Sequence, residues 1–117
     1  IKNHSKKMYQ LIRNLKNKEN KISLYGASGK GQALIQFCKI SNKLIDYTFD
    51  KSKLKQDRFT PGTNIIIKDP KYISRKKIDY LIILSWNIKD EIIKQEKDFF
   101  KKGGKFIVPF PEPKILK

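Results

Sequence analysis

Short apolar runs alternate along this chain with stretches in which apolar residues recur every three or four positions. The short runs lie at Ile22–Tyr25 and at residues 65–67, 78–84 and 106–108. Mostly apolar runs of this length are typical of strands that are buried on both faces. A fifth strand is predicted at residues 45–49, where apolar and other residues alternate with period two.

The longer stretches predict helices. Residues 5–18 and 29–40 carry apolar side chains at helical spacing. A third helix is expected after Asn87, which would cap it together with Asp90, and Gly103 would end it. A weak helical turn is expected at Asp69. The prolines beyond residue 108 are expected to prevent further regular structure.

Strands that alternate with helices predict an α/β fold. We expect a Rossmann-like three-layer domain with a mostly parallel five-stranded sheet and helices on both faces. Right-handed crossovers would place strand 22–25 centrally, with strand 78–84 beside it on the side opposite strand 45–49. The 117 residues have room for one such domain, spanning 1–117. Because the chain begins with Ile1, it is interpreted as a piece of a longer protein.

The amino-acid composition excludes several kinds of functional site. The single cysteine, Cys38, excludes an internal disulfide and a cysteine-based zinc site, and it is expected to be buried beside Leu34. His4, the single histidine, is expected to be solvated. The longest apolar run is too short to span a membrane, and the first residues are polar and basic rather than signal-like. A cytoplasmic location is expected.

The net charge of +16 attracts polyanions at low salt. However, lysines are scattered along the whole chain, and aromatic residues are not interleaved with them on any one segment as a stacking platform requires. We therefore expect weak nonspecific adhesion and no specific nucleic-acid partner.

A glycine-rich loop follows the first strand. Glycines let backbone N–H groups approach a ligand, and the N-terminus of the next helix adds unpaired donors. The loop reads G-x-x-G-x-G rather than the dinucleotide pattern G-x-G-x-x-G, so the usual fingerprint is only partly met. Its candidate phosphate-binding residues are Gly26, Ser28, Gly29, Lys30 and Gly31.

Ligands bind open sheets of this kind where the strand order reverses, beyond the carboxyl ends of the strands. Asp50 ends the second strand, 24 positions after Gly26, close to the spacing of an acidic residue that binds a ribose hydroxyl. Its alternative role is to cap a turn. Ser85, Trp86 and Asn87 follow strand 78–84; the Trp86 ring would stack on a base or sugar, or simply pack inside the protein. No carboxylate pair or general base stands out.

Several ordered motifs resemble the C-terminal domain of the sugar C-methyltransferases, and the resemblance covers nearly the whole chain. One departure is Gly29, where that family more often has Ala or Thr. The motifs are Tyr25–Gly31, Ile45-Asp46-Tyr47 with Asp50, Arg58–Thr63, Ile83–Asn87 with Asp90-Glu91, and Gly103–Pro109 with Pro111-Glu112-Pro113.

The resemblance implies a larger enzyme that methylates a carbon of a nucleotide-linked keto-deoxysugar. An upstream domain of the same chain would bind S-adenosylmethionine and supply the catalytic base, and an N-terminal region would bind zinc. Neither cofactor is expected in this fragment, which would bind the sugar nucleotide and carry no catalytic residue. Besides the loop and Asp50, Thr60 and Thr63 of a predicted type II turn would border the pocket, and residues 85–87 would line its floor.

Two further hypotheses are open at this stage. The chain is alternatively a noncatalytic module that binds a nucleotide or coenzyme A and regulates a partner. Nucleic-acid binding through the lysines is the third, and it predicts a steep salt dependence across unrelated sequences.

Overall fold

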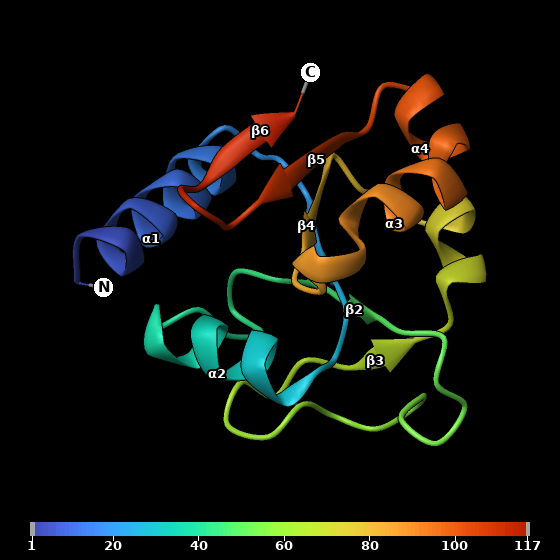
Figure 1. Cartoon of the computed structure of the whole chain (residues 1–117), viewed down its shortest axis with the longest axis horizontal. Helices are drawn as coiled ribbons and strands as arrows, with labels where there is room; N and C mark the ends of the chain where they lie inside the picture. The colour runs from blue at the N-terminus through green and yellow to red at the C-terminus, as the bar shows by residue number, and fades with distance from the viewer. Residues whose placement is uncertain (1, 117) are drawn as a thin grey trace.

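The computed structural model describes residues 2–116, which form one six-stranded sheet with helices on both of its faces (Figure 1). The helices are α1 (Lys2–Asn17), α2 (Gly29–Phe37), α3 (Lys89–Gln95) and α4 (Lys97–Lys101), with the 3₁₀ turns η1 (Pro70–Arg75) and η2 (Trp86–Ile88). The strands are β1 (Ile22–Tyr25), β2 (Thr48–Phe49), β3 (Ile67–Lys68), β4 (Tyr80–Ile83), β5 (Lys105–Val108) and β6 (Lys114–Leu116).

The strand order is β3-β2-β1-β4-β5-β6, and all neighbours pair in parallel except β5 and β6. This confirms the α/β class, the mostly parallel sheet and the central place of β1 between β2 and β4. From β1 the chain adds β2 and then β3 on one side of the sheet. It then crosses over to the other side of β1, where it adds β4 and β5. The strand order therefore reverses between β1 and β4, which is where a doubly wound sheet places its ligand.

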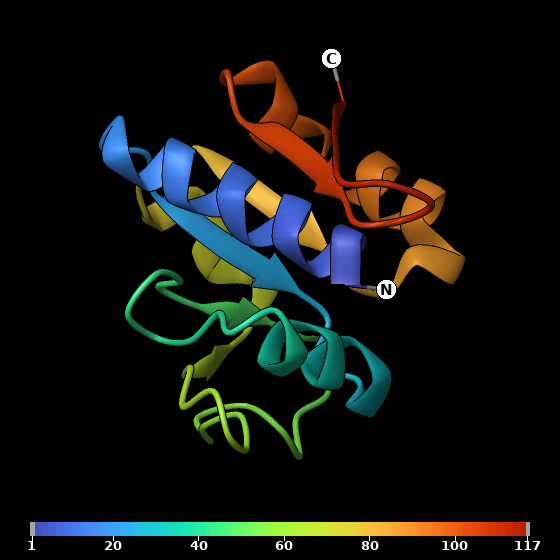
Figure 2. The same ribbon diagram turned by 90° about the vertical axis from the view of Figure 1, so that its left-hand side faces the viewer.

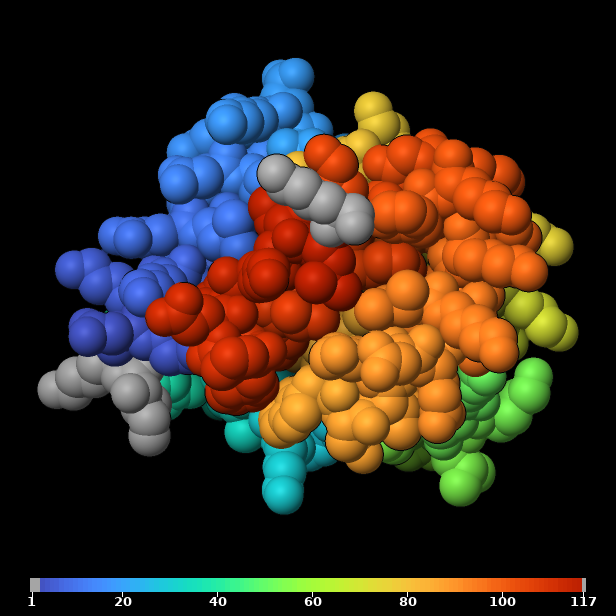
Figure 3. All heavy atoms as spheres, turned by 45° about the horizontal axis from the view of Figure 1, so that its top comes forward, coloured from blue at the N-terminus to red at the C-terminus, as the bar shows by residue number. Residues whose placement is uncertain are grey.

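The predicted strand count of five is wrong, because β6 adds a sixth strand. It pairs antiparallel with β5, Phe106 opposite Leu116 and Val108 opposite Lys114. The prolines at 109, 111 and 113 occupy only the connection, so they do not remove donors from the new strand. Figure 3 shows this C-terminal segment lying between α1 and the α3–α4 pair.

Each face of the sheet has its own apolar core. On one face, α1 and α2 pack Met8, Ile12 and Ile35 against β1 and β4 (Figure 2). On the other, η1, α3 and α4 pack Ile73, Ile92 and Phe99 against the same strands. All six of these side chains are at least nine-tenths buried, and burying one such side chain contributes roughly 1.5–3 kcal/mol.

Several predicted boundaries shift. The helix predicted over residues 29–40 ends at Phe37, because Lys39 adopts a left-handed φ of 59°. The strand predicted at residues 45–49 is reduced to Thr48–Phe49. The third helix is divided into η2, α3 and α4, and the cap of α3 is Ile88, without a side-chain hydrogen bond. The predicted capping role of Asn87 is therefore wrong.

Candidate functional site

The glycine loop leaves β1 at Gly26, and this position requires glycine for two reasons. Its φ of +109° is one that L side chains rarely adopt, and a Cβ there would lie 2.4 Å from Ser85 Oγ. The Gly26 N–H donates to the Phe49 carbonyl across 2.8 Å. The loop is thus held between the carboxyl ends of β2 and β4.

Ser28 caps the helix that follows the loop. Its Oγ accepts the N–H of Gly31 across 3.2 Å, and its backbone is extended, as an N-cap requires. Gly31 lies against Leu84, the residue that follows β4, since a Cβ at Gly31 would come within 2.8 Å of Leu84 Cβ. Gly29 and Lys30 are exposed in the first turn of α2. The ammonium of Lys30 and the positive end of the helix dipole therefore lie at the same end of α2.

Asp50 is bonded to the protein's own backbone. One carboxylate oxygen accepts the N–H of Ala27 and the other that of Ser52, each across 2.8 Å. Gln56 donates to the Asp50 carbonyl across 2.9 Å. These bonds match the turn-capping alternative, while the ribose contact stays a prediction.

A cavity of about 150 Å³ opens at the carboxyl ends of the central strands. Among the predicted site residues, the structure brings Gly26, Asp50 and Ser85 together on its wall. The other predicted residues do not line it. The wall also contains six residues that were not among the predicted site residues: Tyr25, Lys51, Ile88, Glu91, Ile92 and Gln95.

Tyr25 and Gln95 connect β1 to α3 at this cavity. Gln95 Nε2 donates to the Tyr25 hydroxyl across 2.7 Å. Burial raises the pKa of Tyr25 from its ordinary 10.0 to about 12, against a smaller lowering by the Gln95 hydrogen bond. The phenol is therefore protonated at neutral pH. Sequence position alone gave no signal for Gln95, because it comes 70 residues after its partner.

Thr60 and Thr63 lie in a buried network rather than on the cavity wall. Their hydroxyls bond to each other, and Thr63 Oγ1 donates to Gln32 Oε1 across 3.3 Å. Gln32 Nε2 in turn approaches the Gly26 carbonyl at 3.4 Å. Gly62 between them has a φ of +77°, as the third position of a type II turn requires. The threonines thus support the glycine loop through Gln32, which contacts the Gly26 carbonyl.

Trp86 belongs to an aromatic cluster. Its ring lies 4.6 Å from that of Phe110, which stacks on His4 at 4.8 Å. His4 Nε2 also bonds to the Pro109 carbonyl. The expectation of a solvated His4 is therefore wrong, because the antiparallel return of the chain covers it. Asn87 is exposed.

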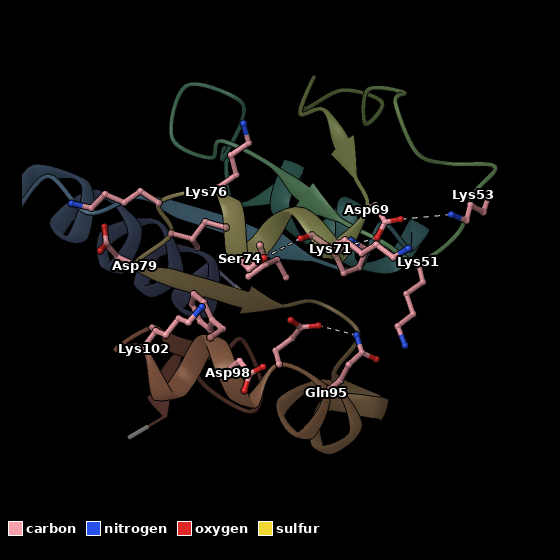
Figure 4. A pocket seen from close by; sticks show the side chains of 17 residues that line it. Lys51, Lys53, Asp69, Lys71, Ser74, Lys76, Asp79, Gln95, Asp98 and Lys102 are labelled. Atoms are coloured by element: carbon pink, nitrogen blue, oxygen red, sulfur yellow. Dashed lines mark hydrogen bonds and ion pairs between the residues drawn. The ribbon is translucent and has the colours of Figure 1, made fainter.

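A larger hollow of about 790 Å³ lies on the face of the sheet that carries η1, α3 and α4 (Figure 4). We call it the η1 groove. Its floor is apolar, with Ile73, Ile78 and Phe99. Side chains from the η1 segment form one bank and side chains from α3 and α4 the other; those shown in Figure 4 include Lys71, Ser74, Lys76, Gln95, Asp98 and Lys102.

Cys38 is buried as predicted, and burial raises the pKa of its thiol to about 11. Within residues 2–116, no three His, Cys, Asp or Glu side chains are grouped so that they could hold a metal ion. Over the same residues, no helix has the length and apolar character needed to cross a membrane.

Comparison with known proteins decides the family. A family model described as the C-methyltransferase C-terminal domain matches residues 1–111. The chain belongs to this family. It is 37% identical over 107 residues to the C-methyltransferase NovU of Streptomyces niveus, a match covering 92% of this chain and 26% of that protein. The C-methyltransferase C-terminal domain described here thus spans about a quarter of the length of this curated relative, and the resemblance found from the motifs is confirmed.

The family's fold also occurs among solved structures of other proteins. The crystal structure of UDP-D-quinovosamine 4-dehydrogenase from Vibrio fischeri aligns with a TM-score of 0.55, over 84% of this chain and 93% of that one. Sequence identity is 17%, so the likeness concerns the fold alone.

Proposed function

We propose that this chain is the substrate-side domain of an S-adenosylmethionine-dependent C-methyltransferase, where it binds a nucleotide-linked deoxysugar. Membership of the C-methyltransferase C-terminal domain family supports the methyltransferase assignment. The observation that carries the substrate-side role is the cavity at the strand-order reversal, which Gly26, Asp50 and Ser85 line together.

The size of this cavity supports a shared site. Pockets that enclose a drug-sized ligand measure about 300–1,000 Å³, whereas this one measures about 150 Å³. It has room for one ring of a sugar nucleotide and no more. The remaining walls would come from the upstream methyltransferase domain of the same chain.

The polar groups on the wall suit a sugar. The carboxylates of Asp50 and Glu91 accept hydrogen bonds from hydroxyl groups, and the hydroxyls of Tyr25 and Ser85 both donate and accept. Apolar Ile88 faces the same space and suits the deoxygenated part of a ring.

The remaining predicted residues do not line the cavity and have supporting roles in this proposal. Lys30, Ser28, Gly29 and Gly31 at the start of α2 would hold phosphate. Trp86 and Asn87 would border the sugar from η2. Thr60 and Thr63 act in this proposal through Gln32 by supporting the loop.

The chemistry itself is assigned to the upstream part of the enzyme. S-adenosylmethionine bound there would supply the methyl group, and the base that takes the proton beside the sugar carbonyl would lie there too, as would the zinc. This chain would orient the sugar and exclude water from one side. We place the enzyme in the cytoplasm and assign it no specific nucleic-acid or membrane partner.

Thermal denaturation of the full-length enzyme with a deoxythymidine diphosphate sugar tests the proposal. A ligand at 100 times its dissociation constant should stabilise the protein by about 2.7 kcal/mol. A full-length enzyme that responds to NAD but to no sugar nucleotide would contradict the assignment. Tight coenzyme A binding by the isolated domain, unchanged by the upstream sequence, would favour the regulatory alternative.

A matched pair of variants tests whether the sugar nucleotide binds in the cavity. Glu91→Gln removes a carboxylate that lines the cavity, and Asp90→Asn removes the neighbouring one, which pairs with Lys89 on the surface. We expect Glu91→Gln to weaken sugar-nucleotide binding roughly tenfold and Asp90→Asn to leave it unchanged. Equal effects would show that the cavity is not the binding site.

A further inference from the structure

The η1 groove carries an excess of unpaired positive charge. Six lysines line it, namely Lys51, Lys53, Lys71, Lys76, Lys77 and Lys102. Among residues 2–116, only Lys53 of these six has a carboxylate within ion-pair distance, that of Asp69 at 3.7 Å. Of the other five, the Lys76 ammonium lies over the Tyr47 ring, 5.5 Å from its centroid. The remaining four ammonium groups are available to an anion.

Most of the carboxylates in the groove already have donors. Asp69 accepts the N–H of Lys71 across 2.9 Å in addition to its ion pair. Asp79 accepts the N–H of Lys21 across 2.6 Å, and Glu96 accepts from Gln95 across 2.8 Å. These hydrogen bonds hold the carboxylates in place but do not cancel their charge. Six lysines against the four carboxylates of Asp69, Asp79, Glu96 and Asp98 give the groove a net charge of +2.

The groove is continuous with the small cavity. Lys51 and Gln95 line both of them. From there the groove runs alongside β4 toward Asp79, which precedes that strand (Figure 4). The four residues of β4 correspond to roughly 13 Å at the usual rise of a strand, and the groove's 790 Å³ falls in the range of ligand pockets.

We propose that the η1 groove binds the nucleoside diphosphate part of the substrate, while the sugar occupies the small cavity. This inference rests on the proposed function and moves the phosphates from the start of α2, where the glycine loop was predicted to hold them, to the groove on the opposite face of the sheet. Lys51 lies at the junction and contacts the phosphate nearest the sugar. Lys71 and Lys102 approach from opposite banks, and apolar Ile73 and Phe99 on the floor receive the nucleoside.

The test uses the full-length enzyme and titration calorimetry at 150 mM salt, with thymidine diphosphate and inorganic pyrophosphate as probes. The groove variant is Lys71→Gln/Lys102→Gln. Its control is Lys18→Gln/Lys43→Gln, which removes the same charge from two exposed lysines outside the groove. Both variants are first compared with wild type by thermal denaturation.

We expect the groove variant to weaken thymidine diphosphate at least about tenfold and the control to stay within twofold of wild type. For the sugar nucleotide, KM should rise by a similar factor with little change in kcat, since these lysines contact a part that does not react. Equal effects of the two variants, or no binding of either probe to wild type, would overturn the inference.

Failure of the proposed function gives a different result. If the groove variant loses thymidine diphosphate binding while no sugar nucleotide is bound or methylated, the groove is an anion site but the enzyme assignment is wrong. If sugar nucleotides bind and react equally well in the groove variant and in wild type, the assignment holds and the groove inference is wrong.

Discussion

The carboxylate of Asp50 accepts the backbone N–H of Ala27 across 2.8 Å, joining the end of β2 to the glycine loop that follows β1. Its second oxygen accepts the N–H of Ser52. One side chain thus fixes two connections at the edge where the strand order reverses. The shape of the candidate site depends on this contact before any ligand is present.

Replacement of Asp50 by Asn should therefore loosen the loop. The amide has one acceptor oxygen, so one of the two backbone N–H groups loses its partner, at a cost of about 1–3 kcal/mol in unfolding free energy. Urea denaturation measures this cost. The control is Asp46→Asn at an exposed position, which should change stability by less than about 0.5 kcal/mol. Equal losses would show that the Ala27 contact is not stabilising.

Gly26, at the start of the loop, and Gly29, the first residue of α2, should respond oppositely to alanine. Gly26→Ala forces a Cβ into a φ of +109° and to within 2.4 Å of Ser85 Oγ, so we expect a loss of at least about 1–3 kcal/mol. Gly29→Ala meets no atom within 4 Å and should be neutral or stabilise α2 by about 0.4–1 kcal/mol.

Adding Ser85→Ala to Gly26→Ala separates the two causes. The double variant should recover the part of the loss that is due to the clash, while the backbone strain remains. Thermal denaturation of wild type, the two single variants and the double variant gives the coupling free energy between positions 26 and 85. Purely additive effects would contradict a clash between these two side chains.

Gln32 should matter more than a surface glutamine, because it connects the glycine loop to the Thr60–Thr63 turn. Gln32→Leu keeps the volume but leaves the Thr63 hydroxyl and the Gly26 carbonyl without this partner. We expect a loss of about 2 kcal/mol or more by urea denaturation. Gln10→Leu, on the exposed side of α1, is the control, and a similar loss there would remove the support for this connection.

Tyr25 makes stability depend on alkaline pH. Its pKa is about 12 in the folded chain and 10.0 by ordinary value, so between these values the unfolded chain loses a proton that the folded chain retains. The contribution of Tyr25 to the unfolding free energy should therefore be fully present below pH 10. It should fall by on the order of 2 kcal/mol as the pH rises toward 12.

Denaturation of Tyr25→Phe across this pH range should show a shallower decline than wild type. The exposed-site variant Tyr9→Phe should decline as wild type does. Absorbance titration of wild type should show one tyrosine that ionises later than the others. Parallel pH profiles for Tyr25→Phe and wild type would contradict a raised pKa.

Local pattern predicted much of the fold. The apolar runs placed β1 correctly, and the alternation of strands with helices predicted the parallel order around it. The sixth strand was missed because three residues, Lys114–Leu116, are too few to show a period, and their pairing with β5 is a tertiary contact. Asn87 was misassigned as a cap because a 3₁₀ turn precedes α3, which its residue type does not reveal.

The candidate site divides in the same way. Gly26, Asp50 and Ser85 were found because each directly follows a predicted strand, and parallel strands end at one edge. Lys51 and Gln95 were missed, since nothing in a local pattern says that the end of α3 faces the end of β2. Thr60 and Thr63 were predicted to border the pocket, but Thr60 bonds to Thr63, which in turn bonds to Gln32 of α2.

By itself, the sequence determined the α/β class, the glycine turn after β1 and the family, because these depend on residue types at short and regular spacing. Only the tertiary structure decided that Asp50 bonds to Ala27, that β6 pairs with β5, and that lysines from separate segments line one groove. Such contacts join residues far apart in the chain. Their geometry is set by how the helices pack on each face of the sheet, which no single segment specifies.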